Sequence, residues 1–250
     1  MDVTFEERIS KLNEAIKASN RIVIFSGAGV STESGIPDFR SKDGLYNRKD
    51  VQFEAYTPEY LLSKSCLLQN SKVFYEFYRQ KMDCRGADPN IAHLKVAELE
   101  RLGKQVSVVT QNIDVLHRKA GSTRVHELHG SIDVNYCCSC KELHSADFIF
   151  DCSEDIPRCT KCGGMVRPNV VLYEEGLPDD AWNEAVHDIM EADLVIVCGT
   201  SLTVYPAAGL IHLVPSKKLV VINRDPTRQD SRASILFHES LGDVFSCVNC

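Results

Sequence analysis

The stretch Arg21-Ile-Val-Ile-Phe-Ser-Gly-Ala-Gly29 is the part of the sequence from which the fold can be deduced. Its first six residues form a short apolar run rich in β-branched side chains, which is typical of a strand buried on both faces. The two glycines let the backbone turn tightly after that strand, approach a pyrophosphate and open a helix whose N-terminus favours its charge. The third glycine of the usual dinucleotide-binding pattern is missing, so a tight structural turn is an equal interpretation of these residues alone.

Comparable runs follow this strand and are separated by segments with helical periodicity. The runs lie at Val106–Thr110, Asn169–Tyr173, Leu194–Cys198 and Leu219–Asn223. Helical patterns begin after the capping box Thr4–Glu7 and cover Asn90–Leu102 and Asp179–Ala192. Strands that alternate with helices predict an α/β fold, in which a doubly wound, Rossmann-like parallel sheet has helices on both faces.

Two long segments interrupt this alternation. A simple βαβ unit would bring its second strand about 30 residues after the first, but here the second strand comes only near residue 106. We therefore expect residues 41–89 to be a helical insertion and residues 132–166, which are rich in cysteine, to be a second one. Together they would form a small lobe beside a sheet domain of residues 1–40, 90–131 and 167–250. Ligands favour the cleft between two such lobes.

The composition is that of an ordinary globular protein. The chain has 250 residues, of which 44% are hydrophobic and 25% charged, and a formal net charge of −7. An acidic chain has no basic footprint for direct contact with nucleic acid. No apolar run approaches the roughly 20 residues that span a bilayer, and the first residues do not resemble a signal peptide. We expect a cytoplasmic monomer that uses neither a membrane nor nucleic acid.

Six of the eleven cysteines lie between positions 137 and 162. In a reducing compartment such crowding favours metal binding over disulfides. The pairs Cys137-x-x-Cys140 and Cys159-x-x-Cys162 are 18 residues apart, which is the spacing of two zinc knuckles. Four thiolates close a tetrahedral shell, so one Zn²⁺ bound there would be structural. Alternatives stay open for four other cysteines: Cys138 and Cys152 as substitute ligands, and Cys247 and Cys250 as a redox or metal pair or a solvated tail.

Polar residues follow two of the expected strands at the edge where doubly wound sheets bind ligands. Thr110-Gln-Asn-Ile-Asp114 comes after one strand, and Glu127-Leu-His-Gly130 comes after a shorter one. His129 is placed to act as a base, because the unperturbed pKa of histidine lies near neutrality. A structural role for this histidine is the alternative interpretation.

Taken together, these motifs resemble the sirtuin family of NAD-dependent protein deacylases. The matching stretches are Gly27–Arg40 (GAGVSTESGIPDFR), Thr110–Asp114, Glu127–Gly130, the two cysteine pairs, Gly199–Leu202 and Ile222–Asn223. The resemblance covers nearly the whole chain.

The resemblance implies that NAD is consumed as a co-substrate and that His129, Asn112 and Asp114 are catalytic. His129 would be the base, and Asp114 would bond the nicotinamide amide. The cofactor-binding residues that it implies are Gly27, Ala28, Gly29, Ser31, Thr32, Phe39, Arg40, Gln111, Asn112, Ile113, Asp114, His129, Gly199, Thr200, Ser201, Asn223 and Asp243.

The resemblance also implies that the substrate is an acetyl-lysine protein or peptide. Val171, Tyr173 and Val204 would contact the acyl-lysine, and the backbone of Glu174 and Glu175 would pair with the peptide as an added strand. In this family the segment usually reads aromatic-Gly-Glu, so the tyrosine followed by two glutamates is a departure.

A second comparison concerns the acyl group. Sirtuins that prefer succinyl-lysine or malonyl-lysine carry a tyrosine and an arginine three residues apart. In this chain Tyr75 is followed at that spacing by Tyr78, and Arg79 lies one position further on.

The reaction implied is transfer of the acetyl group from acetyl-lysine to ADP-ribose, which releases nicotinamide, O-acetyl-ADP-ribose and free lysine. A deacylase for longer uncharged chains and a mono-ADP-ribosyltransferase are alternatives within the same chemistry. Alternatives from other classes are a module that senses dinucleotides and binds nucleic acid, which the acidic charge disfavours, and an NAD-dependent dehydrogenase, which would form reduced nicotinamide.

Overall fold

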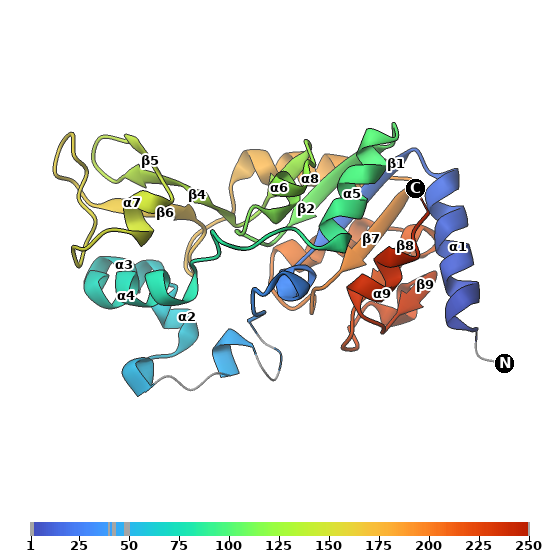
Figure 1. The fold of residues 1–250 in the computed structure, drawn as a ribbon, viewed down its shortest axis with the longest axis horizontal. Coiled ribbons are helices and arrows are strands. Elements are labelled where there is room, and N and C mark those ends of the chain that lie inside the picture. The colour runs from blue at the N-terminus through green and yellow to red at the C-terminus, as the bar shows by residue number, and fades with distance from the viewer. Residues whose placement is uncertain (1–2, 40, 42–43, 48–50, 250) are drawn as a thin grey trace.

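The computed structural model of the chain describes residues 3–39, 41, 44–47 and 51–249. Its larger part is built on a six-stranded sheet in the order β3-β2-β1-β7-β8-β9, in which all neighbouring strands are parallel (Figure 1). This order is that of a doubly wound dinucleotide-binding sheet, so the predicted fold class is confirmed. The strands are β1 (Arg21–Ser26), β2 (Gln105–Thr110), β3 (Val125–Glu127), β7 (Leu194–Cys198), β8 (Leu219–Ile222) and β9 (Ile235–Phe237).

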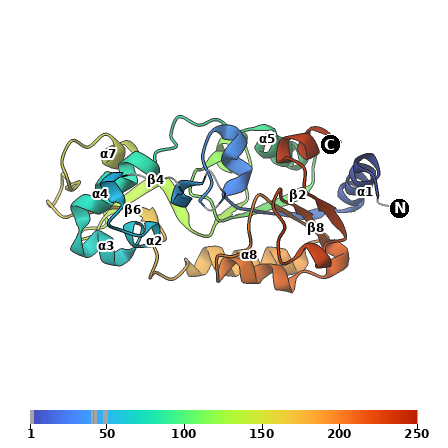
Figure 2. The ribbon, with the colours of Figure 1, turned by 90° about the horizontal axis from the view of Figure 1, so that it is seen from below.

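Each face of this sheet is covered by helices because successive strand residues point to opposite sides. Ile22 and Ile24 of β1 belong to one apolar cluster, and Val23 and Phe25 belong to another. On the opposite side of the sheet from α5 lies α8, as Figure 2 shows. The first cluster includes residues of α1 (Phe5–Ala18), α5 (Ile91–Arg101) and α9 (Leu241–Ser246), and the second includes residues of α8 (Asp179–Glu191) and the 3₁₀ helix η4 (Ala207–Leu213).

The helix boundaries follow the capping signals of the sequence. The Glu7 amide donates to the Thr4 hydroxyl over 3.2 Å, and the Thr4 amide donates to the Glu7 carboxylate over 3.0 Å, so the capping box is formed. Asn90 caps α5 in the same way, with its side chain accepting from the Ala92 amide. In the described part of the chain no helix has both the length and the apolar character required to cross a membrane.

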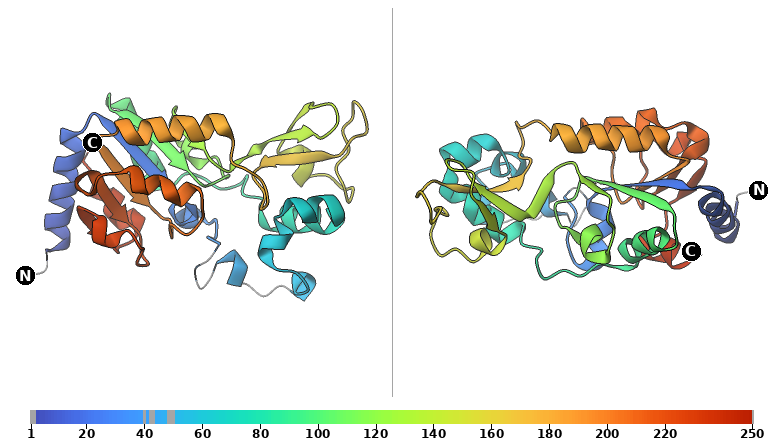
Figure 3. Two further views of the ribbon diagram at one scale, coloured as in Figure 1. Left: turned by 180° about the vertical axis from the view of Figure 1, so that it is seen from behind. Right: turned by 90° about the horizontal axis from the view of Figure 1, so that it is seen from above.

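The two insertions pack together as a small lobe. One apolar cluster joins Phe74 and Tyr78 of the first segment to Ile132, Ile149 and Val166 of the cysteine-rich one. Seen from behind and from above, this lobe lies beyond the end of the parallel sheet, away from both termini (Figure 3). It contains η2 (Leu45–Asn47), η3 (Val51–Phe53), α2 (Pro58–Leu61), α3 (Lys64–Gln69), α4 (Ser71–Lys81) and α7 (Asp147–Phe150), and a sheet of β4 (Gly130–Cys137), β5 (Leu143–Ser145) and β6 (Val166–Val170).

One expected strand lies elsewhere. Of the run predicted at Asn169–Tyr173, only Asn169 and Val170 lie in a named strand, β6 (Val166–Val170). This strand pairs antiparallel with β4 in the small sheet instead of joining the parallel one. A short apolar run does not specify its partner strand, and here the pairing is irregular. The register shifts between Ser131 and Asn135, and Pro168 lies opposite Asn135, next to the irregularity.

Candidate active site

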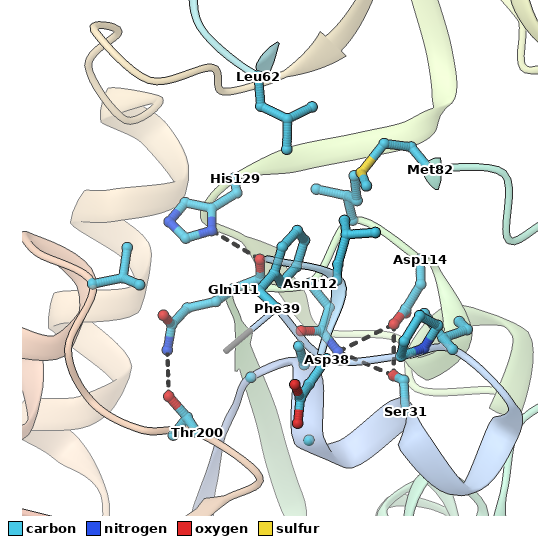
Figure 4. A pocket seen from close by; sticks show the side chains of 18 of the residues that line it. Ser31, Asp38, Phe39, Leu62, Met82, Gln111, Asn112, Asp114, His129 and Thr200 are labelled. Carbon is cyan, nitrogen blue, oxygen red and sulfur yellow. Dashed lines mark hydrogen bonds between the residues drawn. The ribbon is translucent and has the colours of Figure 1, made fainter. Parts of the chain in front are cut away.

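A cavity of about 780 Å³ lies between the two lobes, within the size range of small-molecule sites. Its floor is formed by residues that follow the carboxyl ends of β1, β2, β7 and β8, where doubly wound sheets bind ligands. Leu62 and Met82 of the small lobe face this floor across the cavity, as Figure 4 shows. The cavity is therefore lined by both lobes.

Most of the predicted site residues meet in this cavity. Those expected to bind the cofactor are Gly27, Ala28, Gly29, Ser31, Phe39, Gln111, Asn112, Ile113, Asp114, His129, Gly199, Thr200, Ser201 and Asn223. Those expected to bind the substrate are Val171, Tyr173, Glu174, Glu175 and Val204.

Two other predicted residues, Thr32 and Asp243, are not among the described residues that line the cavity. The Thr32 hydroxyl donates to the main-chain oxygen of Gly29 over 2.9 Å. Asp243 is an exposed residue in the first turn of α9, where its amide donates to the Ser240 hydroxyl. Arg40 lies outside the described residues.

The loop after β1 packs tightly against the loop after β7. The Gly29 amide donates to the Gly199 oxygen over 2.8 Å, and a Cβ on Gly29 would lie 2.8 Å from the Gly199 Cα. Gly199 itself has a φ of +60°, which favours glycine. The chain then continues as a seven-residue helix, η1 (Ala28–Ser34), which is of the 3₁₀ type. These glycines thus have a structural function as well as leaving backbone exposed to a ligand.

A buried polar network lies at the base of the cavity. The Ser31 hydroxyl donates to Asp114 Oδ2 over 2.6 Å, and the side-chain amide of Asn112 donates to the same oxygen over 3.1 Å. Oδ1 of Asp114 accepts from the Leu116 amide over 3.0 Å. An ionised carboxylate offers about four acceptor positions, so these three donors fix its orientation and leave capacity for one ligand donor, such as an amide.

His129 is held in one tautomer by the main chain. Its Nδ1 lies 2.8 Å from the Gln111 oxygen, and a carbonyl only accepts, so Nδ1 carries the proton and Nε2 carries the lone pair of the neutral ring. The Gln111 side chain donates to the Thr200 hydroxyl over 3.2 Å, which ties the loops after β2 and β7 together (Figure 4). On the other side the His129 oxygen accepts from the Val171 amide over 2.8 Å. The imidazole is therefore held in a fixed orientation between the two lobes, with the lone pair of the neutral ring on Nε2.

Two buried histidines support this site from behind, although the sequence gives no signal for them. His117 Nε2 lies 3.0 Å from the Ser26 hydroxyl, and that hydroxyl donates to Thr110 Oγ1. Thr110 Oγ1 also accepts from the main-chain amide of Asn112. The rings of His93 and His117 pack edge to face, 4.7 Å between centroids. Burial lowers the pKa of His93 to about 4 and that of His117 well below its ordinary value, so both rings are neutral at physiological pH.

The small-lobe wall was also not predicted residue by residue. The lining residues Leu45, Tyr46, Leu62, Tyr78 and Met82 come from η2, from α4 and from the positions that follow α2 and α4. Only the tertiary packing brings them together. Ile36 and Asp38 line it as well, and their position inside the stretch Gly27–Arg40 is the one sequence signal that could have identified them.

The four paired cysteines converge in the small lobe, and none of them is among the residues that line the cavity. Their sulfur atoms all lie within 4.8 Å of one another. The distance between Sγ of Cys137 and Sγ of Cys162 is 3.4 Å, and that between Cys140 and Cys159 is 3.7 Å. Zn–S bonds of about 2.3 Å in a tetrahedron place sulfurs about 3.8 Å apart, so these thiolates fit Zn²⁺. Cys138 and Cys152 are not part of this group, and Cys250 lies outside the described residues.

The chain is similar to known proteins over almost its whole length. The Sir2 family model matches residues 27–206. An NAD-dependent protein deacetylase of Clostridium perfringens is 49% identical over 245 residues, which cover 97% of this chain and 99% of that protein. A solved Sir2 structure with a p53 peptide and NAD⁺ is 34% identical with a TM-score of 0.84, and one of Sir2 bound to an acetylated peptide is 33% identical with a TM-score of 0.83; both cover 95% of each chain. The chain belongs to the Sir2 family.

Proposed function

We propose that the protein is an NAD-dependent protein-lysine deacetylase. It transfers the acetyl group of acetyl-lysine to ADP-ribose and releases nicotinamide, O-acetyl-ADP-ribose and free lysine. The observation that carries this proposal is the meeting of a positioned base, His129, and the Ser31–Asn112–Asp114 network in one cavity. Relatives of the chain that bear the name of this activity, with matching coverage of almost the full length, support it.

The cavity has features that fit NAD. The exposed backbone of Gly27 and Gly29 suits the pyrophosphate, and Thr200 and Asn223, at the ends of β7 and β8, suit the adenosine end. The remaining acceptor capacity of Asp114 suits the carboxamide of nicotinamide. When bound, NAD supplies the ribose carbon that receives the acyl oxygen as nicotinamide leaves.

His129 would act as the general base of the reaction. Nε2 bears the lone pair, because Nδ1 donates to the Gln111 oxygen, so Nε2 can accept the proton of a ribose hydroxyl and make that hydroxyl a nucleophile toward the acyl group. The main-chain bonds at Gln111 and Val171 hold the ring in place during this transfer. Asn112 and Asp114 would orient the leaving amide.

The substrate would enter from the small-lobe side. Val171, Tyr173 and Val204 line the cavity and would contact the acyl-lysine, while the main chain of Glu174 and Glu175 would pair with the peptide as an added strand. The Cys137, Cys140, Cys159 and Cys162 thiolates would hold one structural Zn²⁺. Four sulfurs leave no open coordination position, so these residues take no part in the chemistry.

The proposal extends to the domain division, the partners and the cellular compartment of the protein. Residues 41–89 and 132–166 would act as the small lobe, and residues 1–40, 90–131 and 167–250 as the NAD-binding domain. A net charge of −7 supports basic peptides as partners and disfavours nucleic acid. A four-thiolate group suits a reducing compartment such as the cytoplasm. We propose that the protein works there as a monomer, without a membrane.

The direct test is to incubate the protein with an acetyl-lysine peptide, with and without NAD, and to identify the products by mass spectrometry. The expected result is one nicotinamide and one O-acetyl-ADP-ribose for each peptide deacetylated, and no deacetylation without NAD. Deacetylation at full rate in NAD-free buffer would refute the proposal. Formation of reduced nicotinamide would indicate a dehydrogenase instead.

A further inference from the structure

The segment that would hold the peptide is already paired with the small lobe. The Tyr173 amide donates to the Leu62 oxygen over 3.0 Å, and the Tyr173 oxygen accepts from the Lys64 amide over 3.1 Å. Tyr173 and Ser63 thus form a parallel bridge at the start of α3. Since Tyr173 and its neighbours line the cavity, the bridge places one wall of the site against the small lobe.

Glu174, the next residue, has an unusual backbone conformation. Its φ is +74°, in the left-handed region that residues with a side chain rarely adopt. Such a conformation persists only where the surroundings stabilise it. The carboxylate of Glu174 provides this stabilisation, because its Oε2 accepts from the Ser65 amide over 3.0 Å and from the Ser65 hydroxyl over 2.7 Å. Hydrogen bonds to an ionised acceptor are stronger than those between neutral groups.

The following residue fixes the other end of the segment. Glu175 forms a two-bond ion pair with Arg167 of β6, over 2.6 and 2.9 Å. The same carboxylate accepts from the Leu172 amide over 3.0 Å, and the Glu175 amide donates to the Leu172 oxygen, which closes a turn. Glu174 is therefore the side chain that links this turn to α3, while Glu175 links it to the small sheet.

We propose that Glu174 is a positioning residue for peptide binding, acting through its contact with Ser65. This inference rests on the proposed function. The carboxylate does not approach the buried network or the His129 ring in any of the contacts above; it holds residues 172–175 in the conformation that presents their main chain to the cavity. If residues 172–175 are already ordered before the peptide binds, binding does not have to supply the free energy needed to order them. The peptide therefore binds more tightly for the same set of contacts.

The informative variant is Glu174→Gly. Glycine accepts a φ of +74° without strain, so this change removes the carboxylate contact and adds no backbone clash. We expect the KM for the acetylated peptide to rise about 3- to 10-fold, the range for one partly exposed charge-assisted contact. The KM for NAD and kcat should change less than about 2-fold, since the proposed contacts of the cofactor are untouched.

Two matched variants separate this role from a general loss of structure. Glu174→Gln keeps an oxygen that can accept from Ser65 and should restore most of the peptide KM. Ser65→Ala removes the hydroxyl donor and keeps the amide, so its effect should be smaller than that of Glu174→Gly, and it should add nothing in the Glu174→Gly background. Exchange of the Ser65 amide hydrogen, measured without substrate, should accelerate in Glu174→Gly.

The outcomes are distinguishable. An active wild type whose peptide KM is unchanged by Glu174→Gly, or whose NAD KM rises as much as its peptide KM, would overturn this inference and leave the deacetylase assignment standing. A wild type without NAD-dependent deacetylation would overturn the proposed function itself.

Discussion

His126 and His129 are three residues apart in the sequence but lie in different surroundings. Nε2 of His126 lies 2.7 Å from an Asp188 oxygen of α8, and Nδ1 lies 3.3 Å from Glu184 of the same helix. His129 instead lines the cavity and donates to the Gln111 oxygen. One histidine therefore anchors β3 to α8, whereas the other presents a basic nitrogen near the expected position of the substrates.

This difference makes the pair a matched test of the catalytic base. His129→Ala should lower turnover by about 10²- to 10⁴-fold, the usual contribution of a positioned acid–base group. Its melting temperature and zinc content should change little. His126→Ala should keep near-normal turnover but lose about 1–3 kcal/mol of stability, because it removes one hydrogen bond to the Asp188 carboxylate, which Arg124 still contacts. Steady-state kinetics and thermal melts of both variants decide the assignment, and the opposite pattern would identify His126 as the base.

We expect the Asp114 carboxylate to determine how strongly nicotinamide inhibits the enzyme. In Asp114→Asn an amide group replaces an oxygen that now accepts from Ser31 and Asn112, so donors would face donors. Loss of one hydrogen bond to a charged acceptor, about 1.5–3 kcal/mol, should raise the inhibition constant of nicotinamide about tenfold or more. Asp133→Asn, at an exposed aspartate outside the cavity lining, is the control. Equal inhibition of both variants would place nicotinamide elsewhere.

Local signals made much of the fold predictable. The capping box at Thr4 and the apolar run Arg21–Ser26 act through contacts between near neighbours or through burial on both faces, and each formed as expected. The zinc cysteines were predictable for the same reason, since each pair needs only a short turn. The partner of β6 was not predictable, because a run this short carries no signal for the strand with which it pairs.

The site was predictable where it is built from strand ends and not where it is built from packing. Asn112 and Asp114 follow β2 directly, so their place at the crevice follows from the topology. Leu62 and Met82 reach the cavity only because the small lobe folds over it. Asp243 lies in the first turn of α9 and is not among the lining residues, so its contact with the cofactor stays a prediction.

The zinc assignment can be tested with adjacent cysteines. Cys140→Ala removes one of four converging sulfurs and should abolish zinc binding and unfold the small lobe, because binding energy at such a site is folding energy. Cys138→Ala, two positions away, lies outside that group and should retain one zinc per chain. Metal analysis and circular dichroism would report both effects. A metal-free protein that stayed folded and active would contradict a structural role for zinc.

Protonation of Asp188 should account for part of the stability that the fold loses in acid. Burial raises the pKa of its carboxyl, but hydrogen bonds from Arg124, Ser107 and His126 outweigh burial and lower the pKa to about 2. The pKa of an unfolded aspartate is about 3.9. The folded value is the lower one, so the carboxylate stabilises the fold above about pH 4, and this contribution is lost as the pH falls from about 4 to 2.

The measurement is urea unfolding at several pH values. Asp188→Asn should be less stable than the wild type at pH 7, and the gap between the two should narrow as the pH falls below about 4. Because other carboxylates are common to both proteins, the difference isolates this residue. A gap that is constant between pH 7 and pH 2.5 would show that the Asp188 ionisation does not contribute.

The last prediction concerns the acyl group and follows from the orientation of α4. Tyr78 is fully buried and lines the cavity, whereas Arg79 is not among the lining residues. The Arg79 Nε donates to the Ile149 oxygen over 2.9 Å, away from the site, and the Tyr75 hydroxyl donates to the Val166 oxygen over 2.7 Å. A tyrosine and an arginine three residues apart, which would hold a succinyl carboxylate, are therefore not presented to the cavity.

A succinyl group would bring its carboxylate beside the Tyr78 hydroxyl without a guanidinium. An unpaired buried charge costs several kcal/mol, so the kcat/KM for an acetylated peptide should exceed that for the matched succinylated peptide by at least about 10²-fold. Lys81 also lines the cavity and provides the control. Equal or better use of the succinylated peptide would contradict the prediction. If Lys81→Met then lost activity toward that peptide, Lys81 would be the cation that pairs with the succinyl carboxylate. If acetyl preference holds in the wild type, Lys81→Met should leave it unchanged, because the preference comes from the missing arginine.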